Sequence, residues 1–157
     1  MAEDAGNRGL FCDLAGTLVA MDETRQLPLR DGKVVIELMP GVAEKLAPIR
    51  DHLIFVVTNQ AGIKRGRMTM EQVEDAISEL DAKLGGILCG WEICPHDDDD
   101  RCECRKPRGG MLTELGAMFG VDMAASTMVG DQEVDAEAAR AAGVGRFEWA
   151  GHFFGWK

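Results

Sequence analysis

Two aspartates directly follow apolar segments and have the chemistry needed to act together on a phosphate ester. Asp13 follows the apolar run at residues 10–12, and Asp131 follows the run at residues 126–129 after one glycine. If both runs are strands of one parallel sheet, the two carboxylates meet at one edge and repel each other unless a cation lies between them. A site that offers only a few protein oxygens, and leaves room for water and phosphate as further ligands, suits Mg²⁺. A carboxylate held there can attack phosphorus and form an aspartyl-phosphate.

Three more polar side chains have the chemistry of a phosphate site. Thr58 and Asn59 follow a buried-strand pattern at residues 53–57, and their hydroxyl and amide groups can donate to phosphate oxygens. Lys106 precedes Pro107, and because proline suits the first position of a helix, we expect the ammonium just before a helix start. An ammonium there can neutralise charge on a transferring phosphoryl group.

A cysteine and histidine cluster predicts a second metal. Cys94 and His96 are separated by one residue, as are Cys102 and Cys104, with five residues between the pairs. Three thiolates and one imidazole complete a tetrahedral Zn²⁺ shell and leave no position for a catalytic water. We therefore expect a structural zinc that shapes the loop leading into Lys106. The four aspartates at residues 97–100 lack the spacing of a calcium loop and are expected to form a solvated acidic tip.

Bringing these side chains together requires strands and helices that alternate along the chain. The apolar runs predict strands at residues 10–12, 53–57, 87–93 and 126–129, and the intervening patterns predict helices at residues 42–49, 69–84, 109–119 and 133–142. Such alternation favours a parallel sheet covered by helices on both faces, with a ligand beyond the carboxyl ends of the strands. We expect one α/β domain over residues 1–157.

Composition narrows the function class. A net charge of −10 repels nucleic-acid backbone, so nucleic acid is not an expected partner. No apolar run approaches the ~20 residues that cross a bilayer, and no leader pattern opens the chain, so we expect a cytoplasmic protein without membrane contact. Clustering among the 5 cysteines favours metal over disulfides. The expected partner is a small phosphorylated molecule, with the protein acting as a monomer or small homo-oligomer.

In order along the chain, four segments resemble the motifs of the haloacid dehalogenase superfamily: residues 12–17, Thr58 with Asn59, Lys106, and residues 130–135. Within that superfamily, residues 58–66 and 94–107 are similar to the heptose-bisphosphate phosphatase and histidinol-phosphatase group. The resemblance implies a Rossmann-like three-layer sandwich with a central parallel sheet, a zinc-stabilised loop and essentially no cap domain.

The resemblance also implies roles for individual residues. Asp13 would be the nucleophile and a Mg²⁺ ligand, with the backbone oxygen of Ala15 and the carboxylate of Asp131 completing the protein's metal ligands. Asp135 would support the metal shell or orient Lys106. The implied catalytic and substrate-contacting side chains are Thr58, Asn59, Gln60, Arg65, Arg105 and Lys106.

One position departs from the group. Its members carry a second aspartate two residues after the nucleophile, as general acid and base, and here that residue is Ala15. Three explanations stay open: an engineered substitution, a naturally slow or inactive protein, or different chemistry. Phosphonoacetaldehyde hydrolases also have alanine here, but they need a cap for which this chain has no room.

The sequence therefore predicts a Mg²⁺-dependent phosphoric monoester hydrolase acting on a small phosphorylated metabolite, most like a sugar bisphosphate. The alternatives are a histidinol-phosphate phosphatase, a nucleic-acid 3′-phosphatase, or an inactive module that binds a phosphate ligand.

Overall fold

The computed structural model describes residues 6–157, with seven strands and five α-helices among them. In chain order these are β1 (Gly9–Cys12), β2 (Leu29–Arg30), β3 (Lys33–Val34), α1 (Val42–Leu46), β4 (Leu53–Asn59), α2 (Met70–Lys83), β5 (Leu88–Cys94), α3 (Gly110–Phe119), β6 (Thr127–Gly130), α4 (Glu133–Ala141), β7 (Arg146–Trp149) and α5 (Ala150–Phe154).

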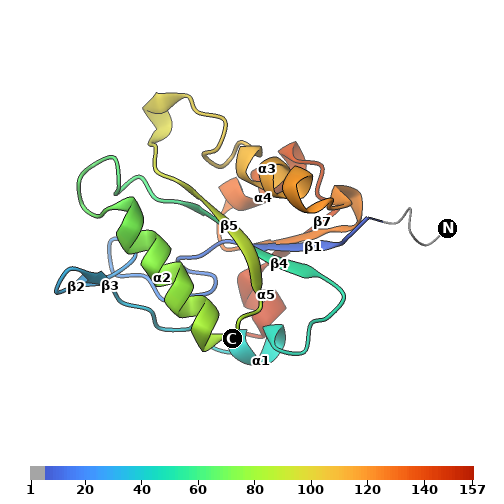
Figure 1. The fold of residues 1–157 in the computed structure, drawn as a ribbon, viewed down its shortest axis with the longest axis horizontal. Coiled ribbons are helices and arrows are strands. Elements are labelled where there is room, and N and C mark those ends of the chain that lie inside the picture. The colour runs from blue at the N-terminus through green and yellow to red at the C-terminus, as the bar shows by residue number, and fades with distance from the viewer. Residues whose placement is uncertain (1–5) are drawn as a thin grey trace.

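A five-stranded sheet with the order β5-β4-β1-β6-β7 forms the middle layer, and all its neighbouring strands are parallel. β1 is central, so Cys12 lies beside Val56 of β4 and Val129 of β6. This register brings the residues after β1 and β6 to one edge of the sheet, as the sequence predicts (Figure 1).

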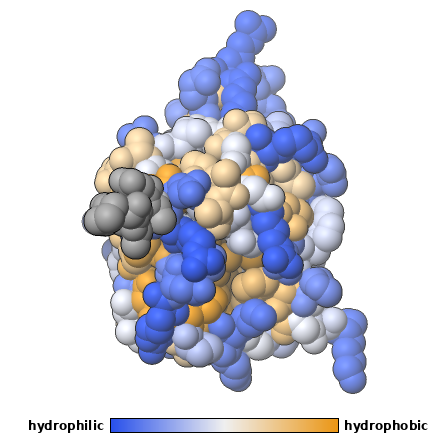
Figure 2. All heavy atoms as spheres, turned by 90° about the vertical axis from the view of Figure 1, so that its right-hand side faces the viewer, coloured by the Kyte–Doolittle hydropathy of each residue, from blue (hydrophilic) through white to orange (hydrophobic). Residues whose placement is uncertain are grey.

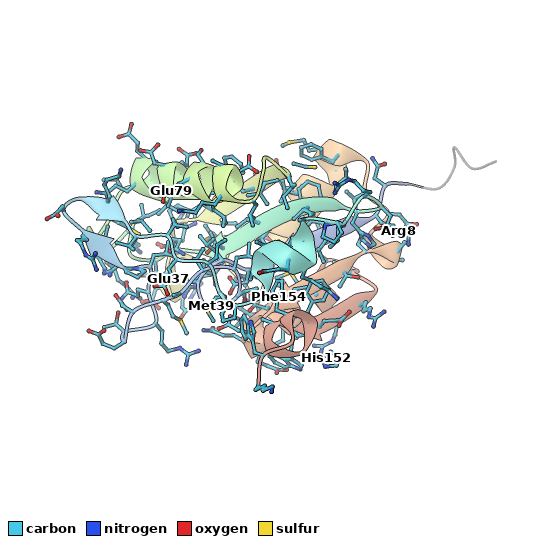
Figure 3. All side chains as sticks on the ribbon, turned by 90° about the horizontal axis from the view of Figure 1, so that it is seen from below. Arg8, Glu37, Met39, Glu79, His152 and Phe154 are labelled. Atoms are coloured by element: carbon cyan, nitrogen blue, oxygen red, sulfur yellow. The ribbon has the colours of Figure 1, made fainter. Side chains whose placement is uncertain are left out.

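The two faces of the sheet bury alternate side chains against different helices. Ile54 and Val56 of β4 belong to the core shared with α1, α2 and α5. Phe55 and Val57 belong to the core shared with α3 and α4, where Phe55 stacks on Phe11 at 5.1 Å between ring centres. The predicted three-layer α/β sandwich is confirmed. Figure 3 shows the layer of α1, α2 and α5 from below.

Several boundaries differ from the predicted ones. Helix α1 ends at Leu46 rather than at residue 49, because Pro48 cannot supply a backbone donor to a further turn. Helix α3 begins at Gly110, so Pro107 does not occupy the first helical position and that prediction is wrong. The β2–β3 hairpin, β7 and α5 are additional elements. No helix within residues 6–157 is long and apolar enough to cross a membrane.

Candidate active site

The residues predicted to do chemistry meet at the carboxyl edge of the central strands. Asp13 directly follows β1, and its backbone amide donates to the carbonyl of Val129 at 3.0 Å. Thr58 and Asn59 end β4, and Asp131 directly follows β6. Parallel strands therefore bring together side chains that lie up to 118 positions apart in the chain.

Lys106 lies at the centre of this group. Its Nζ donates to Asp13 Oδ1 at 2.7 Å, to Asp135 Oδ1 at 2.7 Å and to the carbonyl of Val57 at 3.1 Å. Its side chain is only 2% exposed. All three ammonium protons thus have acceptors, and the two carboxylates share one buried counter-charge.

Burial and charge shift the protonation equilibria here. Burial raises the pKa of Asp13 to about 6, although the Lys106 ammonium opposes the shift. Burial, together with the charge of Asp13, also raises the pKa of Asp135. Burial alone would lower the pKa of Lys106, but the carboxylates of Asp13 and Asp135 raise it above its ordinary value. Among the described residues, the carboxylates of Asp13, Asp131 and Asp135 therefore outnumber the one buried cation beside them, Lys106, which favours binding of a further cation.

The geometry fits a metal ion between the carboxylates. One carboxylate oxygen from each of Asp13, Asp131 and Asp135 lies within 4.8 Å of the others. Thr17 Oγ1 lies 3.3 Å from both Asp13 Oδ2 and Asp131 Oδ1. Gly16 has φ 84°, and a Cβ there would lie 2.4 Å from Asp131 Oδ2, so glycine lets the loop approach this carboxylate. This all-oxygen donor set is the kind that Mg²⁺ prefers.

Asp135 is fully engaged by donors. Besides Lys106, its carboxylate accepts the backbone amides of Asp131 and Gln132, both at 3.1 Å. It is the third residue of α4, so these amides belong to the turn at the helix N-terminus, where a negative charge is stabilised. Asp135 thus fixes both the ammonium and the turn that carries Asp131.

The Asn59 side chain hydrogen-bonds the Lys106 backbone and so holds it at the end of β4. Its amide donates to the carbonyl of Lys106 at 3.1 Å and accepts from the amide of Lys106 at 2.9 Å. Gln60 is buried, and its amide donates to Thr58 Oγ1 at 2.9 Å, so it contacts the site through Thr58. A small pocket of about 80 Å³ has these lining residues: Asp13, Ala15, Arg25, Thr58, Asn59, Lys106, Gln132, Val134 and Asp135.

Three predicted substrate residues lie outside that lining: Gln60, Arg65 and Arg105. Arg105 contacts Asp98 Oδ1 at 2.7 Å and the carbonyl of His96 at 3.0 Å. Arg65 is exposed and lies near enough to Asp98 to lower the pKa of that carboxyl, although the Arg105 hydrogen bond has the larger effect. Residues 98–100 are exposed, as expected of an acidic tip, and the tip is also paired, because Lys64 Nζ lies 3.3 Å from Asp97 and 2.5 Å from Asp100.

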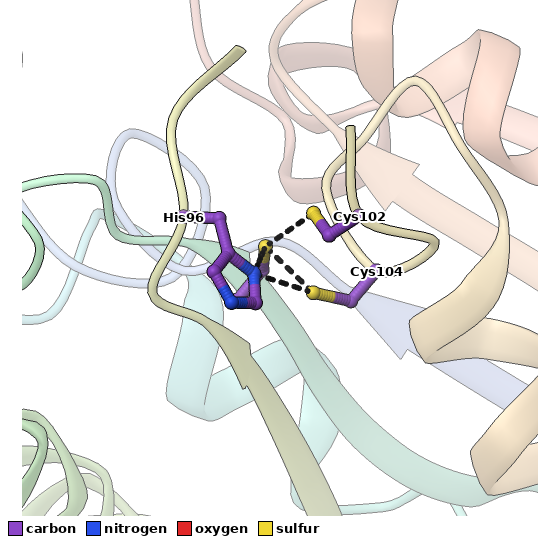
Figure 4. A group of neighbouring side chains, drawn as sticks. His96, Cys102 and Cys104 are labelled. Carbon is purple, nitrogen blue, oxygen red and sulfur yellow. Dashed lines mark hydrogen bonds between the residues drawn. The ribbon is translucent and has the colours of Figure 1, made fainter. Parts of the chain in front are cut away.

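The predicted zinc ligands also meet. The ligand atoms of Cys94, His96, Cys102 and Cys104 all lie within 4.8 Å of one another, and Figure 4 shows the imidazole and three sulfurs facing a common centre. His96 Nδ1 lies 3.3 Å from Cys104 Sγ, and the amide of Arg105 donates to Cys102 Sγ at 3.3 Å. Thiolates that accept backbone amides suit Zn²⁺. The cluster ends one residue before Arg105, so it anchors the segment that carries Lys106.

A larger hollow of about 470 Å³ lies at the opposite edge, where the strands begin. Figure 2 shows this side, with hydrophilic side chains over hydrophobic ones. Its charges are largely satisfied, since Arg8 pairs with Asp51 at 3.8 Å, Arg146 pairs with Glu148 at 3.2 Å, and Lys45 lies over the Phe153 ring. No group of catalytic side chains meets there among the described residues.

Sequence reasoning did not predict that Arg25, Gln132 and Val134 would line the pocket. Gln132 and Val134 lie next to predicted site residues in the sequence, so their place in the pocket could have been predicted. Arg25 belongs to no recognised motif. Its position at the pocket depends on the path of a loop, which the sequence does not specify.

Comparisons with known proteins show the family to which this chain is related. The HAD-hydrolase-like family model matches residues 103–146. The D-glycero-beta-D-manno-heptose-1,7-bisphosphate 7-phosphatase of Haemophilus ducreyi is 33% identical over 151 residues, which cover 88% of this chain and 80% of that protein. The Pseudomonas aeruginosa protein of the same name is 44% identical over 91 residues, 56% of this chain.

The chain spans only part of some relatives. The alignments cover 51% of the Pseudomonas protein and 62% of the Bordetella bronchiseptica one. Among solved structures, the D,D-heptose 1,7-bisphosphate phosphatase of B. bronchiseptica, complexed with magnesium and phosphate, superposes with a TM-score of 0.74. That similarity has 26% sequence identity and covers 88% of this chain and 78% of the other.

Proposed function

Because the chain belongs to the haloacid dehalogenase-like hydrolase family that includes the D-glycero-beta-D-manno-heptose-1,7-bisphosphate 7-phosphatases, we propose that it is a Mg²⁺-dependent phosphatase of a sugar bisphosphate. The relatives' names support the heptose bisphosphate as substrate.

One observation carries the proposal. Asp13 and Asp135 share the Lys106 ammonium at 2.7 Å each, and this ion triad lines the same pocket as Thr58 and Asn59. A carboxylate next to a fixed cation and two neutral donors is arranged to attack a bound phosphoryl group.

We assign the chemistry as follows. An oxygen of Asp13 attacks phosphorus, and the bond from phosphorus to the ester oxygen breaks with its electron pair passing to that oxygen, which takes a proton from solvent. Water then attacks the aspartyl-phosphate, giving inorganic phosphate, a proton and the free carboxylate. Thr58 and Asn59 donate to the phosphoryl oxygens, the Lys106 ammonium offsets their charge from its place beside Asp13, and Asp135 positions Lys106.

Both metals have assigned ligands. Asp13, Asp131 and the backbone oxygen of Ala15 would hold Mg²⁺, which, when bound, neutralises charge on the phosphoryl group. Cys94, His96, Cys102 and Cys104 would hold a structural Zn²⁺.

A second candidate follows from Ala15. Ala15 and Asp13 line the same pocket, and an alanine side chain cannot supply a proton to the leaving group there. A protein that binds a phosphate ligand without turning it over is therefore the competing function.

The test is release of inorganic phosphate from heptose 1,7-bisphosphate, with and without Mg²⁺, by the wild-type chain and by Asp13→Asn. We expect turnover that needs both Mg²⁺ and the Asp13 carboxylate. Histidinol phosphate and a 3′-phosphorylated oligonucleotide complete the substrate panel. Turnover of either one alone would select that alternative, and binding without turnover in calorimetry would select the second candidate.

A further inference from the structure

Arg25 is the one cationic side chain besides Lys106 among the described residues that line the small pocket. Lys106 is buried and fully hydrogen-bonded, whereas Arg25 lines the pocket and is exposed to solvent. A guanidinium can make two parallel hydrogen bonds to a phosphate or a carboxylate.

The backbone at Arg25 is unusual for an arginine. Arg25 has φ 66° in a short loop where Arg25 N donates to the carbonyl of Asp22 at 2.9 Å and Asp22 N donates to that of Gln26 at 2.8 Å. This pattern is a three-residue hairpin loop whose last residue is left-handed, a position that glycine usually occupies. An arginine there costs conformational energy that glycine would avoid. Strain of this kind often marks a functional position.

The loop is nevertheless firmly built. The Asp22 carboxylate accepts the amides of Thr24 and Gln26 at 2.8 and 3.1 Å. Its other oxygen lies 3.0 Å from the Arg67 guanidinium, which ties the loop to the segment after β4. Arg25 is therefore presented from a fixed loop.

Three neighbouring basic residues already have partners. Arg105 binds Asp98, Lys64 binds Asp97 and Asp100, and Arg67 binds Asp22. Within residues 6–157, Arg25 makes no side-chain hydrogen bond or ion pair, so its guanidinium is available to a ligand.

We propose that Arg25 is a specificity-determining residue that binds a second anionic group, a phosphate or a carboxylate, on the substrate whose phosphate ester lies against Asp13 and Lys106. This proposal rests on the proposed phosphatase function. It makes a doubly anionic small molecule the preferred substrate class.

The experiment compares heptose 1,7-bisphosphate with heptose 7-phosphate, which lacks the second phosphate. Arg25→Asn and Arg25→Gly suit the left-handed backbone, so we expect thermal midpoints equal to or above that of the wild type. The ratio of the two kcat/KM values should fall about 10- to 100-fold, the range for a lost charge-assisted hydrogen bond. The loss should appear mainly in KM, and Arg25→Lys should recover part of it.

An equilibrium measurement separates this proposal from the proposed function. Calorimetry on Asp13→Asn, with and without Arg25→Asn, measures binding of the same two compounds without turnover. If no chain turns over either compound but Arg25 still favours the bisphosphate in binding, the phosphatase proposal fails and the Arg25 proposal stands. An unchanged preference for the bisphosphate in both rate and binding overturns the Arg25 proposal.

Discussion

Lys106 Nζ lies 2.7 Å from Asp13 Oδ1 and also 2.7 Å from Asp135 Oδ1. Asp13 directly follows β1, Asp135 lies in the first turn of α4, and the lysine comes from the segment after the cysteine cluster. One buried ammonium therefore connects three separate segments. Burying a charge is costly unless it is paired, so each member of this triad depends on the others.

Replacing Lys106 with methionine keeps most of the volume but leaves two buried carboxylates without their counter-charge. We expect the free energy of unfolding to fall by about 3–5 kcal/mol, as when a buried pair loses one partner. Urea unfolding measures this change. Lys83→Met is the matched control, because Lys83 makes only an exposed contact with Glu79 at 3.9 Å. A loss at Lys106 no larger than the control's would contradict the triad's structural role.

Gly16→Ala should weaken Mg²⁺ binding by at least about 10-fold, because the new Cβ would lie 2.4 Å from Asp131 Oδ2 and must displace that carboxylate. The left-handed backbone adds about 1–2 kcal/mol of strain. Gly32→Ala separates the two effects, since Gly32 has a similar φ of 77° but nothing within 4 Å of its Cβ position. Calorimetric Mg²⁺ titration should show normal affinity for the control. Equal Mg²⁺ affinity in both variants would argue against Asp131 as a ligand.

Protein purified without chelators should contain about one zinc per chain by elemental analysis, as a closed four-ligand site requires. Cys102→Ser should lose this zinc and lower the thermal midpoint by at least about 5 °C, which is more than 1 kcal/mol for a domain of this size. Cys89→Ser is the control, because Cys89 is exposed and lies outside the cluster. Finding no zinc in the wild-type chain would refute the assignment.

The sequence predicted the layers and the catalytic edge because apolar runs and the residues that follow them report directly on buried parallel strands. Asp13 and Asp131 meet as expected because β1 and β6 are neighbouring parallel strands, whereas Lys106 reaches them from the segment between β5 and α3. The meeting of Cys94, His96, Cys102 and Cys104 was predictable because these residues lie close together in the sequence. Features that depend on contacts between residues far apart in the sequence could not be predicted from the sequence.

Arg105 illustrates that limit. The family resemblance implied a substrate contact for Arg105, and the structure pairs its guanidinium with Asp98 at 2.7 Å. Arg25 is the opposite case, a pocket residue that no motif predicted. It lines the pocket because it lies, with a left-handed backbone, in a hairpin loop. Helix α1 ended early for a local reason, Pro48, whereas β7 and α5 are short elements that depend on packing against β6.

The charge of Asp22 should stabilise the loop that carries Arg25 in a pH-dependent way. A hydrogen bond from Thr24, with further help from Gln26 and Arg67, lowers the pKa of Asp22. Because the folded-state pKa lies below the unfolded-state value of about 3.9, the stabilisation is present above that value and is lost as pH falls through the folded-state pKa. Asp22→Asn keeps an acceptor oxygen but has no charge. Its thermal midpoint should therefore lie below that of the wild type at pH 7, with the gap closing in acid. A gap of constant size at every pH would contradict this prediction.

Ala15→Asp should raise the rate of phosphate release, because the pocket provides no proton donor for the leaving oxygen. Among the described lining residues, Asp13 is the proposed nucleophile, Asp135 accepts three hydrogen bonds, and all three Lys106 protons already have acceptors. A carboxylic acid beside Asp13 would protonate the leaving group, and general acid catalysis of this kind contributes about 10²–10⁴-fold.

The gain should depend on the leaving group. An alkyl phosphate such as the heptose 7-phosphate ester releases a strongly basic oxygen and should gain the full factor. The p-nitrophenyl ester releases a stable anion that needs no proton, so its gain should be much smaller. Ala15→Asn is the matched control, since the amide has the size of the acid but cannot transfer a proton. If aspartate and asparagine raise both rates equally, Ala15 affects shape rather than proton transfer, and the leaving group obtains its proton elsewhere.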